Sequence, residues 1–177
     1  LFTLSGGEQW VNGIAYNADG TKIVTTSMAG PVRIWDAKSG ASLYILRGHP
    51  FASGHPIFSP DGKCIVTESA DATARIWDTP GIRDTMGVFN TTQKGKNVSF
   101  HPKGNELMVS SLDSLCLYDP LTREWKQTLY KGDSLRSAYY SPKGNYIILG
   151  LYKQGIKLMN VATKELKTIA GTGKCYM

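Results

Sequence analysis

Short runs of β-branched and aromatic residues alternate along the chain with clusters of Gly, Pro, Asn, Asp and Ser. In the second quarter of the sequence these runs fall at residues 53–58, 63–67, 73–77 and 85–89. Runs of this length and composition, bounded by turn residues, are typical of antiparallel hairpins. No segment shows apolar residues at a sustained helical spacing, so we expect no long helix. The pattern therefore predicts an all-β protein.

The pattern of strands repeats with a fixed period. Residues 32–36 read VRIWD and residues 74–78 read ARIWD, with Trp35 and Trp77 forty-two residues apart. Weaker versions, LYD at 117–119 and LMN at 158–160, follow at intervals of forty-one residues. A period of this length indicates stacked copies of one small unit. The chain therefore contains four copies.

A tight turn recurs in phase with this period. Its four versions are NADG at 17–20, SPDG at 59–62, HPKG at 101–104 and SPKG at 141–144. Proline presets the backbone early in such a turn, and glycine accepts the left-handed conformation at its end. Each copy thus contains a hairpin at the same place. Four short antiparallel strands per copy correspond to one blade of a β-propeller.

On these residues the chain resembles the WD-repeat β-propeller family. The resemblance rests on the two Trp-Asp pairs, the SPDG turn, Gly48-His49, and residues 6–16, which are similar to the family's opening strand with Gly7 in place of the usual His. It extends over essentially all 177 residues and is strongest in the first two copies. It implies blades at residues 10–47, 52–90, 95–131 and 135–171, preceded by the outer strand of another blade at residues 1–5.

The resemblance also implies that four blades leave the ring incomplete. Closed propellers of this family have about seven or eight blades, within the roughly four to eight seen in propellers generally. The unpaired leading strand and the start at Leu1 favour a part of a longer polypeptide whose remaining blades close the ring. Self-association of two copies into a larger ring is one alternative, and an unusually small propeller is another.

Composition indicates whether the chain meets a membrane and in which redox compartment it is found. Hydrophobic residues make up 41% of the chain, and no apolar run approaches the roughly 18 residues that span a membrane. We therefore expect no membrane partner. The cysteines, Cys64, Cys116 and Cys175, are odd in number and far apart, which favours a reducing compartment and a cytoplasmic or nuclear location.

The net charge of +6 is unevenly distributed. Residues 1–88 hold seven Lys and Arg against eight Asp and Glu, a net charge of −1, whereas residues 89–177 hold thirteen against six, a net charge of +7. Such asymmetry predicts that the second half meets an acidic partner. Solvated lysines on β-surfaces are the plain alternative.

One group of residues has the composition of a catalytic site. Thr67, His49 and Asp71 supply a hydroxyl, an imidazole and a carboxylate, the ingredients of a hydrolytic triad. The resemblance implies instead that they form, with Trp77, a structural hydrogen-bond network inside the second blade. Residues 168–175 lack the glycine and hydroxyl spacing of a phosphate-binding loop, and no His or Cys grouping has zinc-like spacing. We therefore expect no enzyme activity, no cofactor and no metal.

Partner binding is expected on loops held by a rigid scaffold. The family's strand order places the loops before each first strand, and the turns between second and third strands, on one rim. Trp10 is the leading candidate there, because Trp and Arg dominate binding hot spots. Apolar residues from early blades beside basic residues from later blades would suit a peptide with an acidic segment. The full candidate set is Trp10, Met28, Phe51, Lys94, Lys96, Arg136, Tyr152 and Lys153.

Together these features predict a non-catalytic scaffold that binds a protein or peptide on the propeller rim. One alternative is a propeller that senses a ligand or partner within a larger signalling or switch protein. Another is binding of nucleic acid or an anionic surface through the basic second half, which would show a steep dependence on salt.

Overall fold

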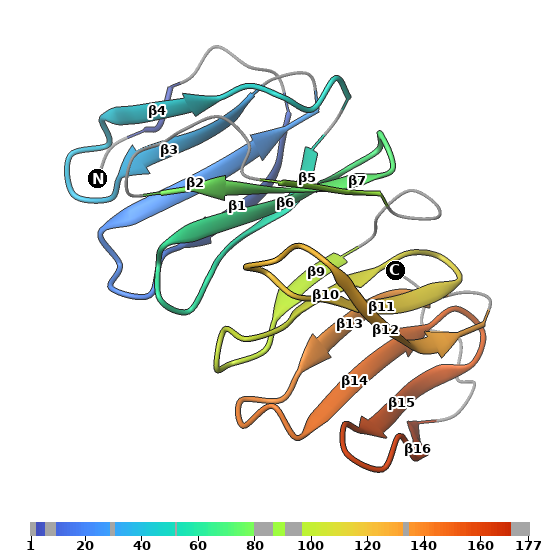
Figure 1. Cartoon of the computed structure of the whole chain (residues 1–177). Helices are drawn as coiled ribbons and strands as arrows, with labels where there is room; N and C mark the ends of the chain where they lie inside the picture. The colour runs from blue at the N-terminus through green and yellow to red at the C-terminus, as the bar shows by residue number, and fades with distance from the viewer. Residues whose placement is uncertain are drawn as a thin grey trace.

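Sixteen β-strands form four separate sheets in the residues that the structure describes, which are 3–5, 10–28, 31–51, 53–79, 87–90, 97–132 and 135–170. In this computed structural model each sheet is built from four consecutive antiparallel strands (Figure 1). The same residues contain no helix, and hence none long and apolar enough to cross a bilayer. The predicted all-β fold of four-stranded units is confirmed.

We call each sheet a blade and number the blades in chain order. The first blade contains β1 (Val11–Tyr16), β2 (Lys22–Ser27), β3 (Val32–Asp36) and β4 (Ser42–Leu46). The second contains β5 (Ser53–Phe58), β6 (Cys64–Ser69), β7 (Thr73–Asp78) and β8 (Gly87–Asn90). The third contains β9 (Asn97–Phe100), β10 (Leu107–Ser110), β11 (Ser114–Tyr118) and β12 (Trp125–Lys131). The fourth contains β13 (Leu135–Tyr140), β14 (Tyr146–Leu151), β15 (Gly155–Asn160) and β16 (Leu166–Ala170).

The strands of the second blade differ slightly from their predicted limits. Lys63 belongs to the turn, where its amide donates to the Asp61 carboxylate at 3.1 Å, so β6 begins at Cys64. The same strand continues to Ser69 because Ser69 pairs with Ser53 across the hairpin. Predicted residues 85 and 86 lie outside the described part of the chain.

The four recurring turns adopt one conformation. Gly20, Gly62, Gly104 and Gly144 have left-handed backbones, with φ of 71°, 69°, 74° and 76°. Each glycine amide donates to the carbonyl three residues earlier, at 3.1, 2.9, 2.7 and 2.8 Å respectively. Only glycine takes this conformation without steric cost. The turn signal read from the sequence is therefore confirmed in all four blades.

Neighbouring blades pack face to face through one repeated contact. Each contact is made on one side by apolar residues from the middle of the second and third strands of one blade. On the other side it is made by the second strand of the next blade and by that blade's residue at the Trp position, which is the position of Trp35 and Trp77. In the first pair these are Val24 and Ile34 against Ile65 and Trp77. The second pair buries Val66 and Ile76 against Leu107 and Tyr118. The third pair buries Met108 and Leu117 against Ile147 and Met159.

The four blades form an open arc. Their innermost strands touch in sequence, β1 with β5, β5 with β9, and β9 with β13. No extensive contact joins the first and fourth blades within the described ranges, and the two lie at opposite ends of the molecule in Figure 1. The ring is therefore incomplete, as predicted.

The predicted leading strand at residues 1–5 stays a prediction. Residues 3–5 have no strand conformation. Leu1 and Phe2 lie outside the described residues.

Candidate functional site

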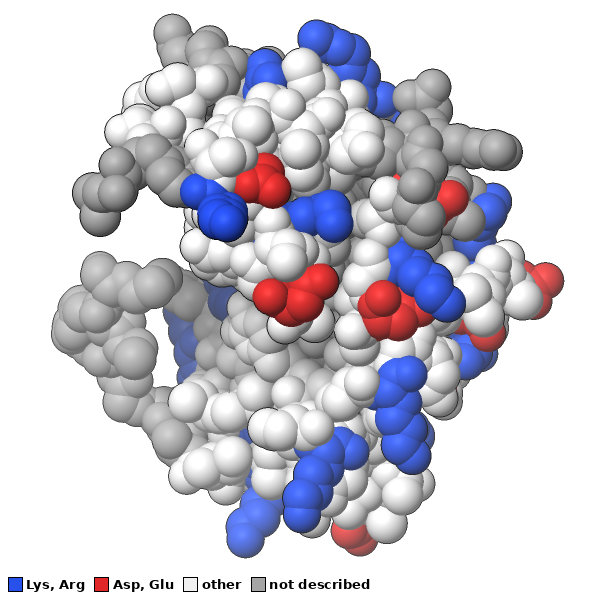
Figure 2. All heavy atoms as spheres, turned by 90° about the vertical axis from the view of Figure 1, so that its left-hand side faces the viewer, with Lys and Arg blue, Asp and Glu red and all other residues white. Residues whose placement is uncertain are grey.

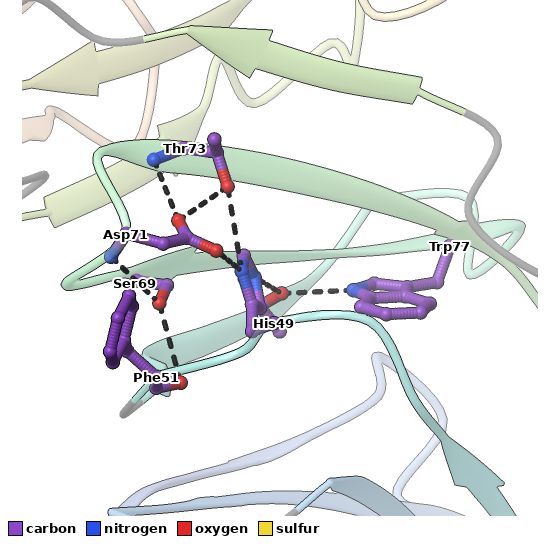
Figure 3. A network of polar contacts seen from close by, with 7 residues as sticks. His49, Phe51, Ser69, Asp71, Thr73 and Trp77 are labelled. Atoms are coloured by element: carbon purple, nitrogen blue, oxygen red, sulfur yellow. Dashed lines mark hydrogen bonds and ion pairs between the residues drawn. The ribbon is translucent and has the colours of Figure 1, made fainter.

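The hydroxyl, imidazole and carboxylate of the second blade lie in one chain of hydrogen bonds (Figure 3). His49 reaches Asp71 through Nδ1 at 2.8 Å and the Thr67 hydroxyl through Nε2 at 2.9 Å. The indole N–H of Trp77 donates to the same hydroxyl oxygen at 2.9 Å. Thr73 completes the group, since its amide donates to Asp71 at 2.8 Å and its hydroxyl at 2.5 Å.

The protonation states fit a neutral imidazole beside an ionised carboxylate. Burial lowers the pKa of His49 and outweighs Asp71, which acts to raise it. Burial alone would raise the pKa of Asp71, but hydrogen bonds from Thr73 and His49 outweigh it and lower that pKa. His49 Nδ1–H therefore donates to Asp71, and Nε2 accepts from Thr67. In this hydrogen-bond network His49 Nδ1 is therefore a donor and His49 Nε2 is an acceptor.

This arrangement does not present Thr67 as a nucleophile, and a structural role for the network stays the prediction. Thr67 is fully buried, with 0% of its surface exposed, and its oxygen already accepts the Trp77 N–H. A triad hydroxyl must meet substrate at an exposed site that also offers oxyanion donors. Buried polar groups that are all paired instead fix one local geometry.

The other blades carry only parts of this network. In the first blade Trp35 donates to Thr25 at 2.9 Å, while the positions equivalent to His49 and Asp71 are Gly7 and Ala29, outside the described residues. In the third blade the Asp113 carboxylate accepts from the Ser111 hydroxyl at 2.7 Å, but Val109 and Tyr118 replace the Thr and Trp.

The network also fixes a loop that belongs to the candidate rim. The Ser69 hydroxyl accepts from the Asp71 amide at 3.2 Å and donates to the Phe51 carbonyl at 3.4 Å (Figure 3). Phe51 lies two residues after His49, and 64% of its surface is exposed. The network thus fixes the backbone of an exposed aromatic residue at the entrance to β5.

Replacing His49 with alanine should lower the free energy of unfolding by about 1–3 kcal/mol, because buried Thr67 and Asp71 would lose their partner. Thr67→Val removes both bonds of the hydroxyl and should have a similar cost. Thr25→Val is the matched control, since its hydroxyl meets Trp35 without a histidine, and it should cost less. Urea melts give these values, and equal midpoints for wild type and His49→Ala would rule the network out.

The candidate rim residues of the first blade lie together at one end of the sheet. The Met28 amide donates to the Trp10 carbonyl at 3.1 Å, which joins the start of β1 to the end of β2. Trp10 is 74% exposed and Met28 is 50% exposed. Trp10 also has a left-handed backbone with φ of 61°, a conformation that is costly for a large side chain.

The candidate residues of the fourth blade form a second group. Arg136 Cζ lies 4.9 Å and Lys153 Nζ lies 5.4 Å from the centre of the Tyr152 ring, which is 53% exposed. Lys153 has a left-handed backbone with φ of 66°. Two cations therefore flank one exposed aromatic ring. Lys94 and Lys96, also candidates, lie outside the described residues.

Sequence reasoning missed one polar pair on the inner strands. His55 Nδ1 lies 3.1 Å from Glu68 Oε1, and the Glu68 side chain is only 7% exposed. Gly54 makes room for this carboxylate, since any Cβ there would collide with it. An uninterrupted count outward from the turn, from Phe58 opposite Ile65, sets His55 across from Glu68; the structure has a register shift between Gly54 and Ile57 and pairs Gly54 with Glu68. That cross-strand count was the available signal.

The His55–Glu68 pair should make stability depend on pH. The hydrogen bond to Glu68 raises the pKa of His55 above its ordinary value. A raised native pKa stabilises the fold at pH below about 6.5 and loses that effect as pH rises through the native pKa. The difference in unfolding free energy between wild type and His55→Gln should thus shrink from pH 5.5 to pH 9, from at most about 1 kcal/mol.

Taking the difference between wild type and His55→Gln cancels the contribution of His49 to the pH dependence. That contribution has the opposite sign, because the native pKa of His49 is lowered. Urea melts at several pH values measure the difference. A difference that grows with pH would contradict the assignment.

The rim with the four tight turns carries charges of both signs. Figure 1 places these turns on its left, and Figure 2 views that side, where acidic side chains lie between basic ones. Lys126 Nζ lies 3.8 Å from Glu106 and 3.6 Å from Asp119. This rim therefore has no uniform basic surface in the described residues.

The described residues contain no group of three or more His, Cys, Asp or Glu side chains that could hold a metal ion. Cys64 and Cys116 are free thiols in strands, as the sequence predicts, and Cys175 lies outside the described residues. Burial raises the pKa of Cys64, which keeps it a thiol at neutral pH and unreactive.

Comparisons with known proteins agree with this architecture. The family model described as "WD domain, G-beta repeat" matches residues 1–36 and 40–78, up to the end of β7. A stretch of 38 residues, 22% of this chain, is 42% identical to Lissencephaly-1 homolog 1 of Paramecium tetraurelia. That stretch spans only 9% of the length of the Paramecium protein. The comparison thus identifies WD repeats in the first two of the four blades.

Proposed function

We propose that the chain is a non-catalytic platform that binds a peptide with an acidic segment on the rim formed by the loops before each first strand. WD repeats generally mediate protein–protein interaction and generally serve as non-catalytic scaffolds. The observation that carries the proposal is the exposure of large side chains on strained or fixed backbones at this rim. Such backbone strain often accompanies binding sites.

The apolar part of the proposed surface comes from the first two blades. Trp10 and Phe51 are the two most exposed aromatic residues of these blades within the described ranges. Each is held through its backbone, Trp10 by Met28 and Phe51 by Ser69. An exposed aromatic side chain on a fixed backbone can bury a large area and has few rotamers to lose, which makes it a strong anchor.

The basic part of the proposed surface comes from the fourth blade. The contacts of Tyr152 with Arg136 and Lys153 orient two cations toward solvent around one ring. Arg binds carboxylates with two parallel hydrogen bonds. An acidic segment could therefore bind here while an apolar residue of the same peptide contacts Trp10 or Phe51. The free thiols Cys64 and Cys116 favour a reducing compartment for this activity.

Peptides selected from a random phage-displayed library on the wild-type chain provide the test. We expect them to contain Asp or Glu near an aromatic or aliphatic residue. Trp10→Ala should weaken their binding by at least about tenfold, as for a hot-spot residue. Arg136→Ala should weaken it and reduce its salt dependence.

Trp125→Ala is the matched control, because Trp125 is 59% exposed on β12 of the third blade. Its variant should bind the selected peptides as wild type does. Equal affinities for Trp10→Ala and Trp125→Ala would refute the proposed surface. Tighter, steeply salt-dependent binding of a single-stranded oligonucleotide would favour nucleic acid as the partner instead.

A further inference from the structure

The second blade has an ionisable pair, His55 and Glu68, where the other blades have uncharged residues. Equivalent positions on the first strands lie four residues before each recurring turn, and their partners lie across the hairpin on the second strands. The equivalents of His55 are Gly13, Asn97 and Ser137, and those of Glu68 are Thr26, Ser110 and Gly150. Three blades therefore form the same hairpin without a carboxylate. A buried Glu is rare and costly, so Glu68 requires a reason other than the fold.

An irregularity in β5 brings the imidazole of His55 to this carboxylate. The pairing of β5 with β6 shifts between Gly54 and Ile57, and such bulges redirect side chains. Glu68 Oε1 lies over Gly54 and 3.1 Å from Nδ1 of His55. The Glu68 side chain is buried, whereas 58% of the His55 side chain is exposed. In the described residues Nε2 of His55 has no hydrogen-bond partner, so this nitrogen can meet a ligand.

His55 lies where the first two blades meet, near the strand ends that carry the aromatic anchors of the proposed surface. The innermost strands β1 and β5 pack against each other. At the candidate rim Asn12 Nδ2 donates to the Ser53 carbonyl at 3.2 Å, which ties the start of β1 to the start of β5. Trp10 is two residues before Asn12, Phe51 is two residues before Ser53, and His55 is two residues after it. The exposed imidazole is therefore close to the rim between the two anchors.

In the described residues Glu68 is the charged side chain that faces His55. The strands packed against β5 are β1, β2, β6 and β9. β1 and β9 contain no charged residue, β2 contains only Lys22, at its end away from this rim, and β6 contains only Glu68. Lys94 and Lys96, which precede β9, lie outside the described residues. The charge of His55 is therefore balanced by one buried carboxylate.

We propose that His55, positioned by buried Glu68, is a further contact for the acidic segment of the peptide and binds it only when the imidazole is protonated. This inference rests on the proposed function. A protonated imidazole donates from both nitrogens, so Nδ1–H stays with Glu68 while Nε2–H donates to a peptide carboxylate. A neutral imidazole that donates through Nδ1 has a lone pair on Nε2, and it leaves the charge of Glu68 uncompensated. Both changes weaken binding as pH rises. The hydrogen bond to Glu68 raises the pKa of His55, which moves the change toward neutral pH.

Histidine-free peptides selected at pH 6 on the wild-type chain are the probe. Their carboxylates, and the Arg and Lys side chains of the chain, keep their charges from about pH 6 to pH 9. Wild type should bind them at least about fivefold more tightly at pH 6 than at pH 9, the effect of one charge-assisted hydrogen bond. His55→Gln should bind with nearly one affinity at both. Titration calorimetry in buffers of different ionisation enthalpy should show proton uptake on binding to wild type and none on binding to His55→Gln.

Glu68→Gln tests the positioning residue. Gln keeps an oxygen that accepts from Nδ1 but removes the charge, so the midpoint of the affinity profile should move down toward about pH 6.5, the ordinary value for histidine. His101→Gln is the matched control, because His101 lies in a tight turn on the opposite rim, and it should keep the wild-type profile. A wild-type affinity that is constant or rises with pH, or an unchanged midpoint in Glu68→Gln, would overturn the proposal.

Trp10→Ala separates this inference from the proposed surface. Peptides that need Trp10 but bind equally at both pH values leave the surface intact and overturn the role of His55. Peptides that follow His55 and ignore Trp10 support the imidazole contact and refute the aromatic anchor. Peptides that depend on neither residue refute both. Circular dichroism of every variant at both pH values shows that the fold is kept.

Discussion

Replacing Trp77 with alanine is expected to lower the free energy of unfolding by about 3–5 kcal/mol, the usual cost of removing a buried aromatic side chain. Trp77 is 0% exposed and packs between the first and second blades with Val24, Ile34 and Ile65. The substitution also removes the N–H that pairs with Thr67. Because domains of this kind are stable by about 5–15 kcal/mol, a fifth or more of the free energy of unfolding would be lost.

Trp125→Ala is the internal control for this prediction. Trp125 lies on the outermost strand of the third blade and is 59% exposed, so its loss should change stability by less than about 0.5 kcal/mol. Urea-induced unfolding followed by circular dichroism measures both variants. If the two tryptophan variants unfold at the same urea concentration, Trp77 does not hold the first two blades together.

Gly144→Ala is expected to cost about 2–4 kcal/mol, from a left-handed backbone at an L-residue and overpacking against a neighbour. Gly144 has φ of 76°. A Cβ built on it would collide with the ring of His101, in the equivalent turn of the preceding blade. His101 in turn packs edge-on against Tyr140, with ring centres 5.1 Å apart. The turn of the fourth blade therefore accepts the imidazole only because residue 144 has no side chain.

Gly20→Ala separates the two contributions. Gly20 has a similar φ of 71°, but a Cβ there would meet nothing within 4 Å. It should therefore show only the backbone cost of about 1–2 kcal/mol. The double substitution His101→Ala with Gly144→Ala should recover part of the difference. Thermal or urea melts measure these changes in stability. If Gly144→Ala and Gly20→Ala lower the free energy of unfolding equally, the turn of Gly144 does not contact His101.

Much of the fold could be predicted from the sequence because its signals are local and repeated. The strand runs, the four glycine-terminated turns and the Trp-Asp pairs each specify structure within a few residues. Because the four copies can be aligned, residues that replace the tryptophan of the first two copies can be identified from the sequence. Met159 and Tyr118 still occupy the Trp position and remain buried, although neither can donate an indole N–H.

The exposure of Ile148 could not be predicted, because it depends on neighbours that the strand pattern does not encode. Ile148 and Val66 occupy the same position in the same kind of strand, and only the packing of the blades shows that one is covered. The basic excess of the second half is another example. It indicates an acidic partner, but it does not show which cations gather: in the described residues Arg136 and Lys153 flank Tyr152, whereas Lys126 pairs with Glu106.

One four-stranded unit recurs four times in the described residues, and the second and third strands of each unit are hydrogen-bonded to a neighbouring strand on both sides. Native-state hydrogen exchange measures this directly, since strands that are paired on both sides open only with high free energy. The middle strands should exchange slowly, in four pairs that recur about every forty-one residues: β2 and β3, β6 and β7, β10 and β11, β14 and β15. The outermost strands β4, β8, β12 and β16 should exchange faster in every unit. Protection without this period, or protection extending evenly across the outermost strands, would contradict a fourfold repeat of this unit.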